Sequence, residues 1–401
     1  MSCYERTDQF FDSPVDRKNT QSLKWSHDDF DSTNTPLPSD VLPMWVADMD
    51  FRSPRPVLEA LHERIDHGVF GYPSAPSKEY FDAISNWQGE RFGWDIPRDW
   101  IIPTAGVITA LKTAVQAFSS PGDSVLIQPP VYSHFHDDIL VNGRHLAYAP
   151  LARNGDRYVF DPGVFEAAIT PSTRIFILSN PHNPTGNVWS EEELRLMGEI
   201  CLKNDVLVIS DEVHQDFILV PEKKHIPFAS LDHRIAARSI TCTAPSKTFN
   251  LAGLQCSNVF IPDRFLREEF ARQYTRNLYP RVNALGTVAA EAAYRHGAKW
   301  LKSLLEYIVV NRSSFADSIN DSDSPLHVLP SDSLYLAWID CRELGLSPEE
   351  LHHFMLREAG LWLDAGTKFG IEGEGYMRIN LGCPRSTVDA AVSRLLDATS
   401  A

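Results

Sequence analysis

The chain has 401 residues, of which 43% are hydrophobic and 22% are charged. This is ordinary globular usage, and it excludes a chain that is disordered throughout. Lysine and arginine number 37 against 53 for aspartate and glutamate, a formal net charge of −16, so neither nucleic acid nor an anionic membrane is expected as the main partner. The length favours one large domain joined to a smaller one.

The cysteines are scattered and form no C-x-x-C pair. They are Cys3, Cys201, Cys242, Cys256, Cys341 and Cys383. The second, third and fourth lie in or beside apolar runs, and we interpret them as reduced thiols of the core rather than as metal ligands or nucleophiles. The first residues lack the basic-then-apolar order of a secretion signal, and no apolar run approaches the ~20 residues of a membrane helix. The sequence therefore predicts a cytoplasmic protein without a metal site.

From about residue 100, short apolar runs alternate with helical patterns. Each run has the length of a strand and is apolar on both faces, which is typical of a sheet covered by helices on both sides. The predicted strands are residues 124–128, 174–178, 206–210, 239–243 and 258–261. This alternation of strands and helices predicts a mostly parallel α/β sheet.

Two helices can be placed around these strands. Leu111, Val115 and Phe118 recur at i, i+4 and i+7 and form one apolar stripe. Ser190 followed by Glu193 is a capping box, which predicts the beginning of a second helix. The apolar stripe of that helix comprises Leu194, Met197 and Cys201.

The pattern changes after about residue 290. A long helical stretch, 291–312, precedes a polar segment, 317–325. A strand-like run, 334–339, and another helical stretch, 347–359, follow. We interpret this part as a second, α+β domain. The predicted boundaries are 51–286 for the large domain, and 1–50 together with 287–401 for the small one.

Polar side chains follow three of the predicted strands. They are Asn180 and Asn183 after 174–178, Asp211 and His214 after 206–210, and Ser246 and Lys247 after 239–243. In open α/β sheets, ligands bind at the carboxyl ends of the strands, so we expect these side chains to converge on one site. Gly106 opens the first amphipathic helix, where free N–H groups and the helix dipole favour an anion.

Each of these residues also has a structural interpretation: Lys247 could be an ordinary surface lysine, although a charge directly after a buried strand is costly, and the helix start at Gly106, taken alone, is more often one that binds nothing. Asp211 is equally suited to cap a helix, and the two asparagines suit a proline-rich turn. A lone His214 is more often a structural histidine. For His134 and His136, the favoured interpretation is that they lie in a loop or at a helix start and have no role in a site. Spacing alone therefore indicates an α/β enzyme with an amine, a carboxylate and a candidate phosphate site.

Three motifs in this order resemble the fold-type I pyridoxal-phosphate enzymes: N-P-x-N-P-T-G at 180–186, D-E-V-H at 211–214 and A-P-S-K-T-F-N-L-A-G-L at 244–254. More narrowly, the chain is similar to the cystathionine β-lyase/PatB-type C–S lyase branch of the class I/II aminotransferase superfamily. The segments that carry the narrower resemblance are 16–25, 44–51, 68–72, 125–132, 239–254 and 373–385. The resemblance implies a large domain with a mostly parallel seven-stranded sheet and a smaller α+β domain.

The resemblance also implies the cofactor, pyridoxal 5′-phosphate, and a role for each site residue. Lys247 would hold the cofactor covalently, Asp211 would pair with its pyridine nitrogen, and Tyr132 would stack on its face. Asn183 would donate to the phenolic oxygen, with His214 nearby. The remaining implied contacts are Gly106, Val107, Ile108 and Ser246 for the phosphate, Tyr72 of a second subunit for the same phosphate, and Arg378 for the substrate α-carboxylate. A homodimer that acts on a small amino acid is therefore implied.

The implied reaction is β-elimination from cystathionine or a cysteine S-conjugate, which releases a thiol, pyruvate and ammonia. An aminotransferase that uses the same Lys247 and Asp211 is the alternative, and a non-catalytic regulator that holds the cofactor is a weaker one. Gln255 stands where broad aminotransferases usually have an arginine, which favours the lyase. Other departures from the family pattern lie at 105–108, 133–136, 279–281 and 333–334, and they leave the substrate side chain open.

Overall fold

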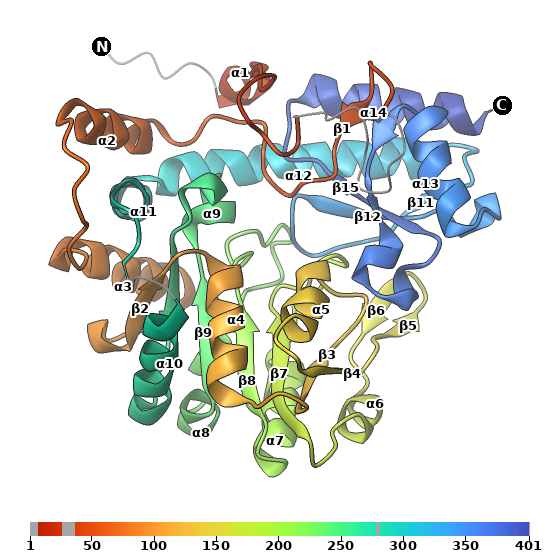
Figure 1. Cartoon of the computed structure of the whole chain (residues 1–401). Coiled ribbons are helices and arrows are strands. Elements are labelled where there is room, and N and C mark those ends of the chain that lie inside the picture. The colour runs from red at the N-terminus through yellow and green to blue at the C-terminus, as the bar shows by residue number, and fades with distance from the viewer. Residues whose placement is uncertain (1–6, 26–36, 278–280, 401) are drawn as a thin grey trace.

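The computed structural model describes residues 7–25, 37–277 and 281–400. Cys3 and the departures at Tyr279 and Pro280 lie outside these residues. Figure 1 shows a large sheet with helices on both faces, and a smaller sheet beside it that is covered by the C-terminal helices. The chain begins its first described helix, α1 (Thr7–Asp12), on the side of the molecule that carries the smaller sheet.

The large sheet has seven strands and is mostly parallel, as predicted. In spatial order the strands are β2 (Ile101–Thr104), β10 (Ser257–Phe260), β9 (Ser239–Thr243), β8 (Leu207–Asp211), β7 (Thr173–Ser179), β3 (Ser124–Ile127) and β4 (His145–Tyr148). Strand β10 runs antiparallel to both of its neighbours, and the other pairings are parallel. All five strands predicted from the sequence are present, and β2 and β4 complete the two edges.

Alternate side chains of the central strands enter two different cores, because successive residues of a strand point to opposite faces. In β7, Ile175 and Ile177 face one core, and Phe176 and Leu178 face the other. The first core lies under α4 (Val107–Phe118), α5 (Ser133–Leu140) and α10 (Arg264–Asn277). The second lies under α6 (Pro162–Ala167), α7 (Glu191–Lys203) and α8 (His233–Ala237). Burial on both faces explains why these strands are continuous apolar runs.

Helix α7 begins at the predicted capping box. The Ser190 hydroxyl accepts from the Glu193 backbone N–H at 3.2 Å, and the Glu193 carboxylate accepts from the Ser190 N–H at 2.8 Å. Leu194, Met197 and Cys201 are buried, as their spacing predicted. Burial of each aliphatic side chain contributes about 1.5–3 kcal/mol.

The smaller sheet has four antiparallel strands. Their order is β11 (His327–Val328), β12 (Leu336–Asp340), β15 (Tyr376–Asn380) and β14 (Asp364–Ala365). One face packs against α12 (Ala298–Asn320), α13 (Pro348–Arg357) and α14 (Arg385–Thr399). On the other face, Trp338 and Tyr376 stack with ring centroids 5.3 Å apart and join the second core of the large sheet. This contact couples the two sheets.

The prediction of a single helix at 291–312 is wrong. The structure has α11 (Ala284–His296) and α12, separated at Gly297. Helix α11 packs against α2 (Arg55–Asp66) and α3 (Lys78–Phe92), whereas α12 packs against α14. A Cβ atom at Gly297 would lie 2.4 Å from the Phe249 ring, so a glycine is required where the two helices part. Helix α12 also continues to Asn320, into the segment 317–325 that was expected to be non-helical.

The remaining elements connect these layers. They are β1 (Leu42–Pro43), which pairs with β13 (Leu361–Trp362), the ribbon β5 (Ala152–Asn154) and β6 (Arg157–Val159), and the short helix α9 (Pro245–Thr248).

No described helix, including the 23 residues of α12, combines the length and the apolar character needed to span a membrane. Within the described ranges, the structure also contains no cluster of three metal-ligating His, Cys, Asp or Glu residues. The five described cysteines are all free and buried.

Candidate active site

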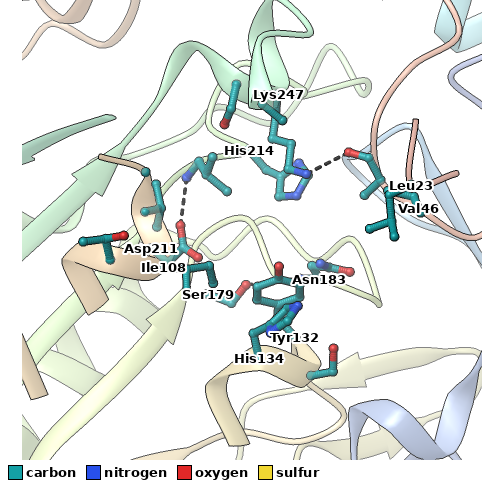
Figure 2. Close-up of a pocket in the computed structure, with 18 of the residues that line it drawn as sticks. Leu23, Val46, Ile108, Tyr132, His134, Ser179, Asn183, Asp211, His214 and Lys247 are labelled. Carbon is teal, nitrogen blue, oxygen red and sulfur yellow. Dashed lines mark hydrogen bonds between the residues drawn. The ribbon is translucent and has the colours of Figure 1, made fainter. Parts of the chain in front are cut away.

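A pocket of about 640 Å³ lies where β7, β8 and β9 end, facing the smaller sheet (Figure 2). The predicted site residues that line it are Gly106, Val107, Ile108, Tyr132, Asn183, Asp211, His214, Ser246, Lys247 and Arg378. Tyr72 does not line the pocket of its own chain, and 94% of its surface is exposed. The structure therefore brings together the side chains of three strand ends, a helix start and one strand of the smaller sheet.

Lys247 lies in α9, directly after β9, and points into the pocket. Its Nζ atom donates to the carbonyl oxygen of Ala47 at 2.7 Å. Burial of the ammonium group and, to a smaller extent, the nearby Arg378 guanidinium lower the pKa of Lys247, whereas Asp48 and Asp211 raise it, and the net result is a pKa of about 8. A lysine with such a pKa has a substantial neutral fraction near pH 8, which a nucleophile or a base requires.

Asp211 is the last residue of β8 and is 6% exposed. Its Oδ1 atom accepts from the backbone N–H of Val213 at 3.2 Å. No helix begins here, so the interpretation of Asp211 as a helix cap is wrong. Burial raises the pKa of Asp211 to about 7, against the lowering effects of the Val213 N–H and Lys247. A cationic ligand group beside this carboxylate would favour its ionised form.

His214 is buried in the turn after β8, and its Nδ1 atom has no hydrogen-bond partner among the described residues. Burial moves the pKa of His214 well below its usual value, and the positive charges of Lys247 and Arg378 add to this shift. The imidazole is therefore neutral. An unpaired ring nitrogen at a pocket wall is available to a polar group of a ligand.

The start of α4 forms the third side of the pocket. Gly106 has φ of 92°, and α4 has no side-chain cap. A Cβ atom added at Gly106 would meet nothing within 4 Å, so the open space lies directly beside the first N–H groups of the helix. These groups have no partner within the helix, and together with the helix dipole they favour an anion such as phosphate. The Ser246 hydroxyl belongs to the same pocket.

Arg378 reaches the pocket from β15 of the smaller sheet and is 4% exposed. One Nη atom donates to Asn183 Oδ1 at 3.2 Å, and the other donates to the carbonyl oxygen of Trp45 at 3.0 Å and to the Asp364 carboxylate. The Nε atom has no partner among the described residues. Asp364 also pairs with Lys368 at 3.1 Å. The guanidinium is thus held in place by its two Nη atoms, with the Nε–H free.

Tyr132 contributes an aromatic wall opposite the lysine (Figure 2). Burial raises the pKa of Tyr132 above its usual value, and the nearby Asp211 carboxylate adds to the shift, so the phenol keeps its proton. The Tyr132 and His134 ring centroids are 5.2 Å apart. Asn183 is fixed by its own backbone N–H, which donates to Ser179 Oγ at 3.2 Å.

Several pocket residues were missed by the sequence reasoning. We expected His134 to lie at a helix start without a role in the site. It does lie at the start of α5, but it also lines the pocket. His136 does not line it, and its ring centroid lies 5.9 Å from that of Tyr148. Leu23, Trp45, Asp364 and Lys368 also line the pocket. Of these, Asp364 carried a usable signal, because it follows the apolar run 361–363 as Asp211 follows its strand.

These features fit pyridoxal 5′-phosphate. The pocket offers an amine of lowered pKa, a buried carboxylate without a cationic side chain bound to it, and a helix start with open space in front of it. An aldehyde, a pyridinium nitrogen and a phosphate are the groups that these three would complement.

Comparison with known proteins agrees with this chemistry. Residues 39–395 match the family of class I and II aminotransferases. The chain is 44% identical over 392 residues to cystathionine beta-lyase PatB of Bacillus subtilis (strain 168), covering 97% of this chain and all of the relative. It is similar to the crystal structure of cystalysin from Treponema denticola, which contains a pyridoxal 5′-phosphate cofactor, with a TM-score of 0.93 and 36% identity over 97% and 98% of the two chains.

A second similar structure is a PLP-bound putative aminotransferase from Clostridium difficile 630, with a TM-score of 0.93 and 39% identity over 97% of this chain and 99% of that chain. The match to the family extends over most of the sequence and includes all the pocket residues from Trp45 to Arg378. The chain therefore belongs to the class I and II aminotransferase family.

Proposed function

We propose that this protein is a pyridoxal-phosphate-dependent carbon–sulfur β-lyase. It would cleave cystathionine or another S-substituted cysteine to a thiol, pyruvate and ammonia. The observation that carries the proposal is that Lys247, Asp211 and Arg378 line one pocket and that the other two charges act on the lysine, in a chain that is 44% identical along its length to a relative named cystathionine beta-lyase.

The pocket residues suggest how the cofactor would be held. Lys247 would bind its aldehyde carbon, Asp211 its pyridine nitrogen, and Asn183 its phenolic oxygen, with His214 beside it. The phosphate would lie at the start of α4, against the N–H groups of Val107 and Ile108 and the Ser246 hydroxyl. Tyr132 would cover one ring face. When bound, the cofactor supplies an aldehyde for the substrate amine and a ring that accepts the electron pair of the Cα–H bond.

The chain's own groups would then perform the binding and the proton transfer. Arg378 would bind the α-carboxylate of the amino acid through its free Nε–H and through an Nη–H that exchanges its present acceptor for the substrate, because a guanidinium binds a carboxylate through two parallel hydrogen bonds. This fixes the direction of the Cα–H bond relative to Lys247. The neutral Lys247 amine removes the Cα proton and carries it at Nζ, where the Ala47 carbonyl accepts a hydrogen bond.

The thioether sulfur departs with the electron pair of the Cβ–S bond and is released as a thiol after protonation. One water is consumed when the three-carbon remainder is hydrolysed to pyruvate and ammonia, so the atoms balance without an oxidant or reductant. Lys247, which would already carry the Cα proton, would return it to the sulfur. The departing side chain would extend toward the pocket wall formed by Leu23, Trp45, His134 and Lys368.

We further infer a homodimer in which Tyr72 of one subunit contacts the phosphate in the other. Three side chains of the loop after α2 are strongly exposed: Val69 at 63%, Phe70 at 57% and Tyr72 at 94%. A short loop that exposes this much apolar surface is typical of a protein interface. We also infer a large domain of residues 51–286 and a small domain of residues 1–50 and 287–401. The free, buried cysteines support a reducing, cytoplasmic location.

The test is incubation of the cofactor-loaded protein with cystathionine and with several S-substituted cysteines. Equal amounts of thiol and pyruvate would support the lyase. Formation of the keto acid of the intact substrate, with the cofactor converted to its amine form, would instead establish an aminotransferase. This is the second candidate because one similar structure, 39% identical, is described as a putative aminotransferase. Cofactor binding without turnover of any substrate would leave only a cofactor-holding regulator.

A further inference from the structure

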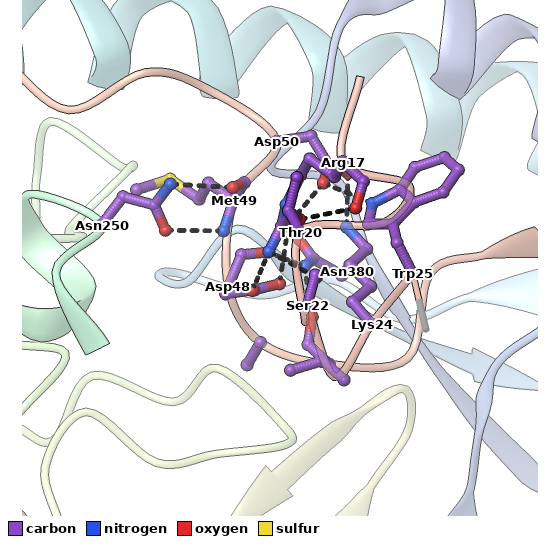
Figure 3. Close-up of polar contacts among 12 residues, drawn as sticks. Arg17, Thr20, Ser22, Lys24, Trp25, Asp48, Met49, Asp50, Asn250 and Asn380 are labelled. Carbon is purple, nitrogen blue, oxygen red and sulfur yellow. Dashed lines mark hydrogen bonds and ion pairs between the residues drawn. The ribbon is translucent and has the colours of Figure 1, made fainter. Parts of the chain in front are cut away.

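A network of charged side chains connects residues 17–25 to residues 44–51, next to the pocket (Figure 3). Arg17 lies between two carboxylates: Nη2 is 2.6 Å from Asp48 Oδ2, and Nη1 is 2.6 Å from Asp50 Oδ1. Lys24, whose side chain is fully buried, is 2.5 Å from the other oxygen of Asp50. Trp25 Nε1 also donates to Asp50, at 2.9 Å. Apolar side chains would make this contact without the cost of removing charges from water, so packing alone does not explain the network.

The segment held by this network carries backbone acceptors for two of the pocket cations, Lys247 and Arg378. The carbonyl of Ala47 accepts from Lys247 at 2.7 Å, and the carbonyl of Trp45 accepts from Arg378 at 3.0 Å. A shift of this backbone would move both acceptors together. The position of 45–48 therefore affects the orientation of the lysine directly and, together with Asn183 and Asp364, that of the arginine.

Uncharged side chains fix the same segment from the other side. Asn380 donates to the carbonyls of Val46 and Asp48, both at 2.6 Å. Tyr335 donates to the Ala47 carbonyl at 2.9 Å. Asn250 bonds the N–H and the carbonyl of Met49 (Figure 3). These uncharged contacts fix the path of the backbone but do not alter the electrostatic potential at the lysine. The charged network does, because it includes Asp48, whose carboxylate acts on Lys247.

Asp48 links the network to the electrostatics of Lys247. Its carboxylate favours the charged form of the lysine, as does Asp211, whereas Arg378 favours the neutral form. Two further polar groups close to the lysine are uncharged, since burial keeps His214 neutral and keeps Tyr335, which shares the Ala47 acceptor, protonated. Of these groups, Asp48 is the one whose charge is balanced by a side chain outside the pocket, namely Arg17.

We propose that Arg17 is a positioning residue for Lys247: it binds Asp48 and Asp50, holds the Ala47 carbonyl against the lysine, and neutralises Asp48 so that the lysine reacts as a free amine. The consequence for the C–S lyase reaction rests on the function proposed above. The effect on the lysine itself does not, because it exists before any substrate binds.

The test measures the rate at which the cofactor-free protein takes up pyridoxal phosphate, followed by absorbance from pH 6 to pH 10. Uptake requires the neutral amine, so its rate rises with pH through the pKa of Lys247. In Arg17→Gln, Asp48 is no longer balanced, and we expect the midpoint to move to higher pH by on the order of 0.5 unit. In Asp48→Asn, a carboxylate that favours the ammonium is removed, and we expect the midpoint to move to lower pH.

The double variant Arg17→Gln/Asp48→Asn removes the pair as a neutral unit. We expect its midpoint to lie close to that of the unmodified protein, because the shifts of the two single variants oppose each other. Arg17→Lys retains the charge and should restore the midpoint at least in part. Arg55→Gln is the matched control, because Arg55 pairs with Glu59 on the surface, and we expect no shift.

Loss of thermal stability in Arg17→Gln with an unchanged midpoint would overturn the proposal and leave Arg17 as a structural residue only. If that variant fails to fold, unchanged midpoints in both Arg17→Lys and Asp48→Asn would overturn it equally. Failure of the proposed function would give a different result. A protein that takes up the cofactor with these pH shifts but cleaves no thioether would overturn the lyase function and still support the role of Arg17.

Discussion

The Nζ atom of Lys247 lies 2.7 Å from the carbonyl oxygen of Ala47, a residue 200 positions earlier in the chain. The carbonyl of Trp45, two residues before Ala47, accepts from Arg378. The N-terminal part of the chain therefore forms one side of a pocket whose other walls come from the large sheet and the smaller sheet (Figure 2).

Lys247→Ala is expected to abolish lyase activity, because the same amine binds the cofactor and removes the Cα proton. A loss of at least about 10³-fold in pyruvate formation is expected for a residue with both roles. The uptake of pyridoxal phosphate by the unmodified protein should rise with pH around the Lys247 pKa of about 8, since the neutral fraction of the amine increases above its pKa. Lys203→Ala, at a surface ion pair with Glu166, is the control. Full turnover by Lys247→Ala would contradict the assignment.

Asp211→Asn is expected to reduce turnover and, in the cofactor-free protein, to increase stability. Burial raises the pKa of Asp211 to about 7 from 3.8, so the folded state binds this proton more tightly than the unfolded state does. Its contribution to stability is present below about pH 4 and is lost as pH rises to about 7. Replacement by asparagine should therefore raise Tm above pH 7 and change it little near pH 4, in melting curves recorded across this range. Asp317→Asn, an exposed position, should show no such pH dependence.

Arg378→Lys should weaken substrate binding more than it slows the chemical step. A lysine ammonium cannot reproduce the paired hydrogen bonds of a guanidinium to a carboxylate, so a rise in KM of about 10-fold or more is expected. Steady-state kinetics with one S-substituted cysteine separate KM from kcat. Arg342→Lys, which alters a surface pair with Asp340, serves as the control, and an unchanged KM in Arg378→Lys would place the α-carboxylate elsewhere.

The proposed dimer predicts complementation between two inactive subunits. Lys247→Ala lacks the amine, and Tyr72→Ala lacks the proposed contact to the other subunit's phosphate. In a mixed dimer, the site that retains Lys247 receives Tyr72 from its partner, so activity should reappear when the two variants are unfolded and refolded together. Light scattering of the unmodified protein should give the mass of two chains. A monomer, or no recovery on mixing, would contradict the shared site.

Ser190→Ala should lower the free energy of unfolding without an effect on catalysis. The Ser190 hydroxyl caps α7 by accepting from the Glu193 N–H, and loss of such a cap costs about 1 kcal/mol. Ser313→Ala, in the exposed interior of α12, removes a hydroxyl that bonds only the preceding turn, at Val309. Denaturant unfolding should show a loss at Ser190 and no comparable loss at Ser313.

The central strands and the residues at their ends could be predicted because both follow from one physical pattern. A strand buried on both faces is a continuous apolar run, and the polar residues that terminate such runs in a parallel sheet share one edge. Asn183, Asp211 and Lys247 were located in this way, and the structure places all three on the pocket wall.

The edge strands could not be found by the same pattern. In β4, the residues at both ends are exposed, so no apolar run marks it. In β2, Pro103 interrupts the sequence pattern, but an edge strand tolerates a proline because one side of it makes no ladder hydrogen bonds. Strand prediction from apolar runs therefore favours the centre of a sheet.

The acceptors at Trp45 and Ala47 could not be predicted at all, because a backbone carbonyl is the same in every residue. Lys368 and His134 reach the pocket only through the way the segments pack against one another, and nothing in their local sequence distinguishes them from surface residues. The break at Gly297 was missed for a related reason: apolar periodicity continues across it, and only the contact with Phe249 shows why the helix divides.

The contacts that Trp45 and Ala47 make with the two cations have one more consequence. No single amino-acid exchange deletes a main-chain oxygen, so these anchors persist whatever side chains occupy 45–47. The side chains of Trp45 and Val46 meanwhile line the pocket, where they can be varied to admit a bulkier or a smaller leaving group. Libraries that randomise these two positions should thus redirect the choice of thioether while the lysine and the arginine keep their anchors.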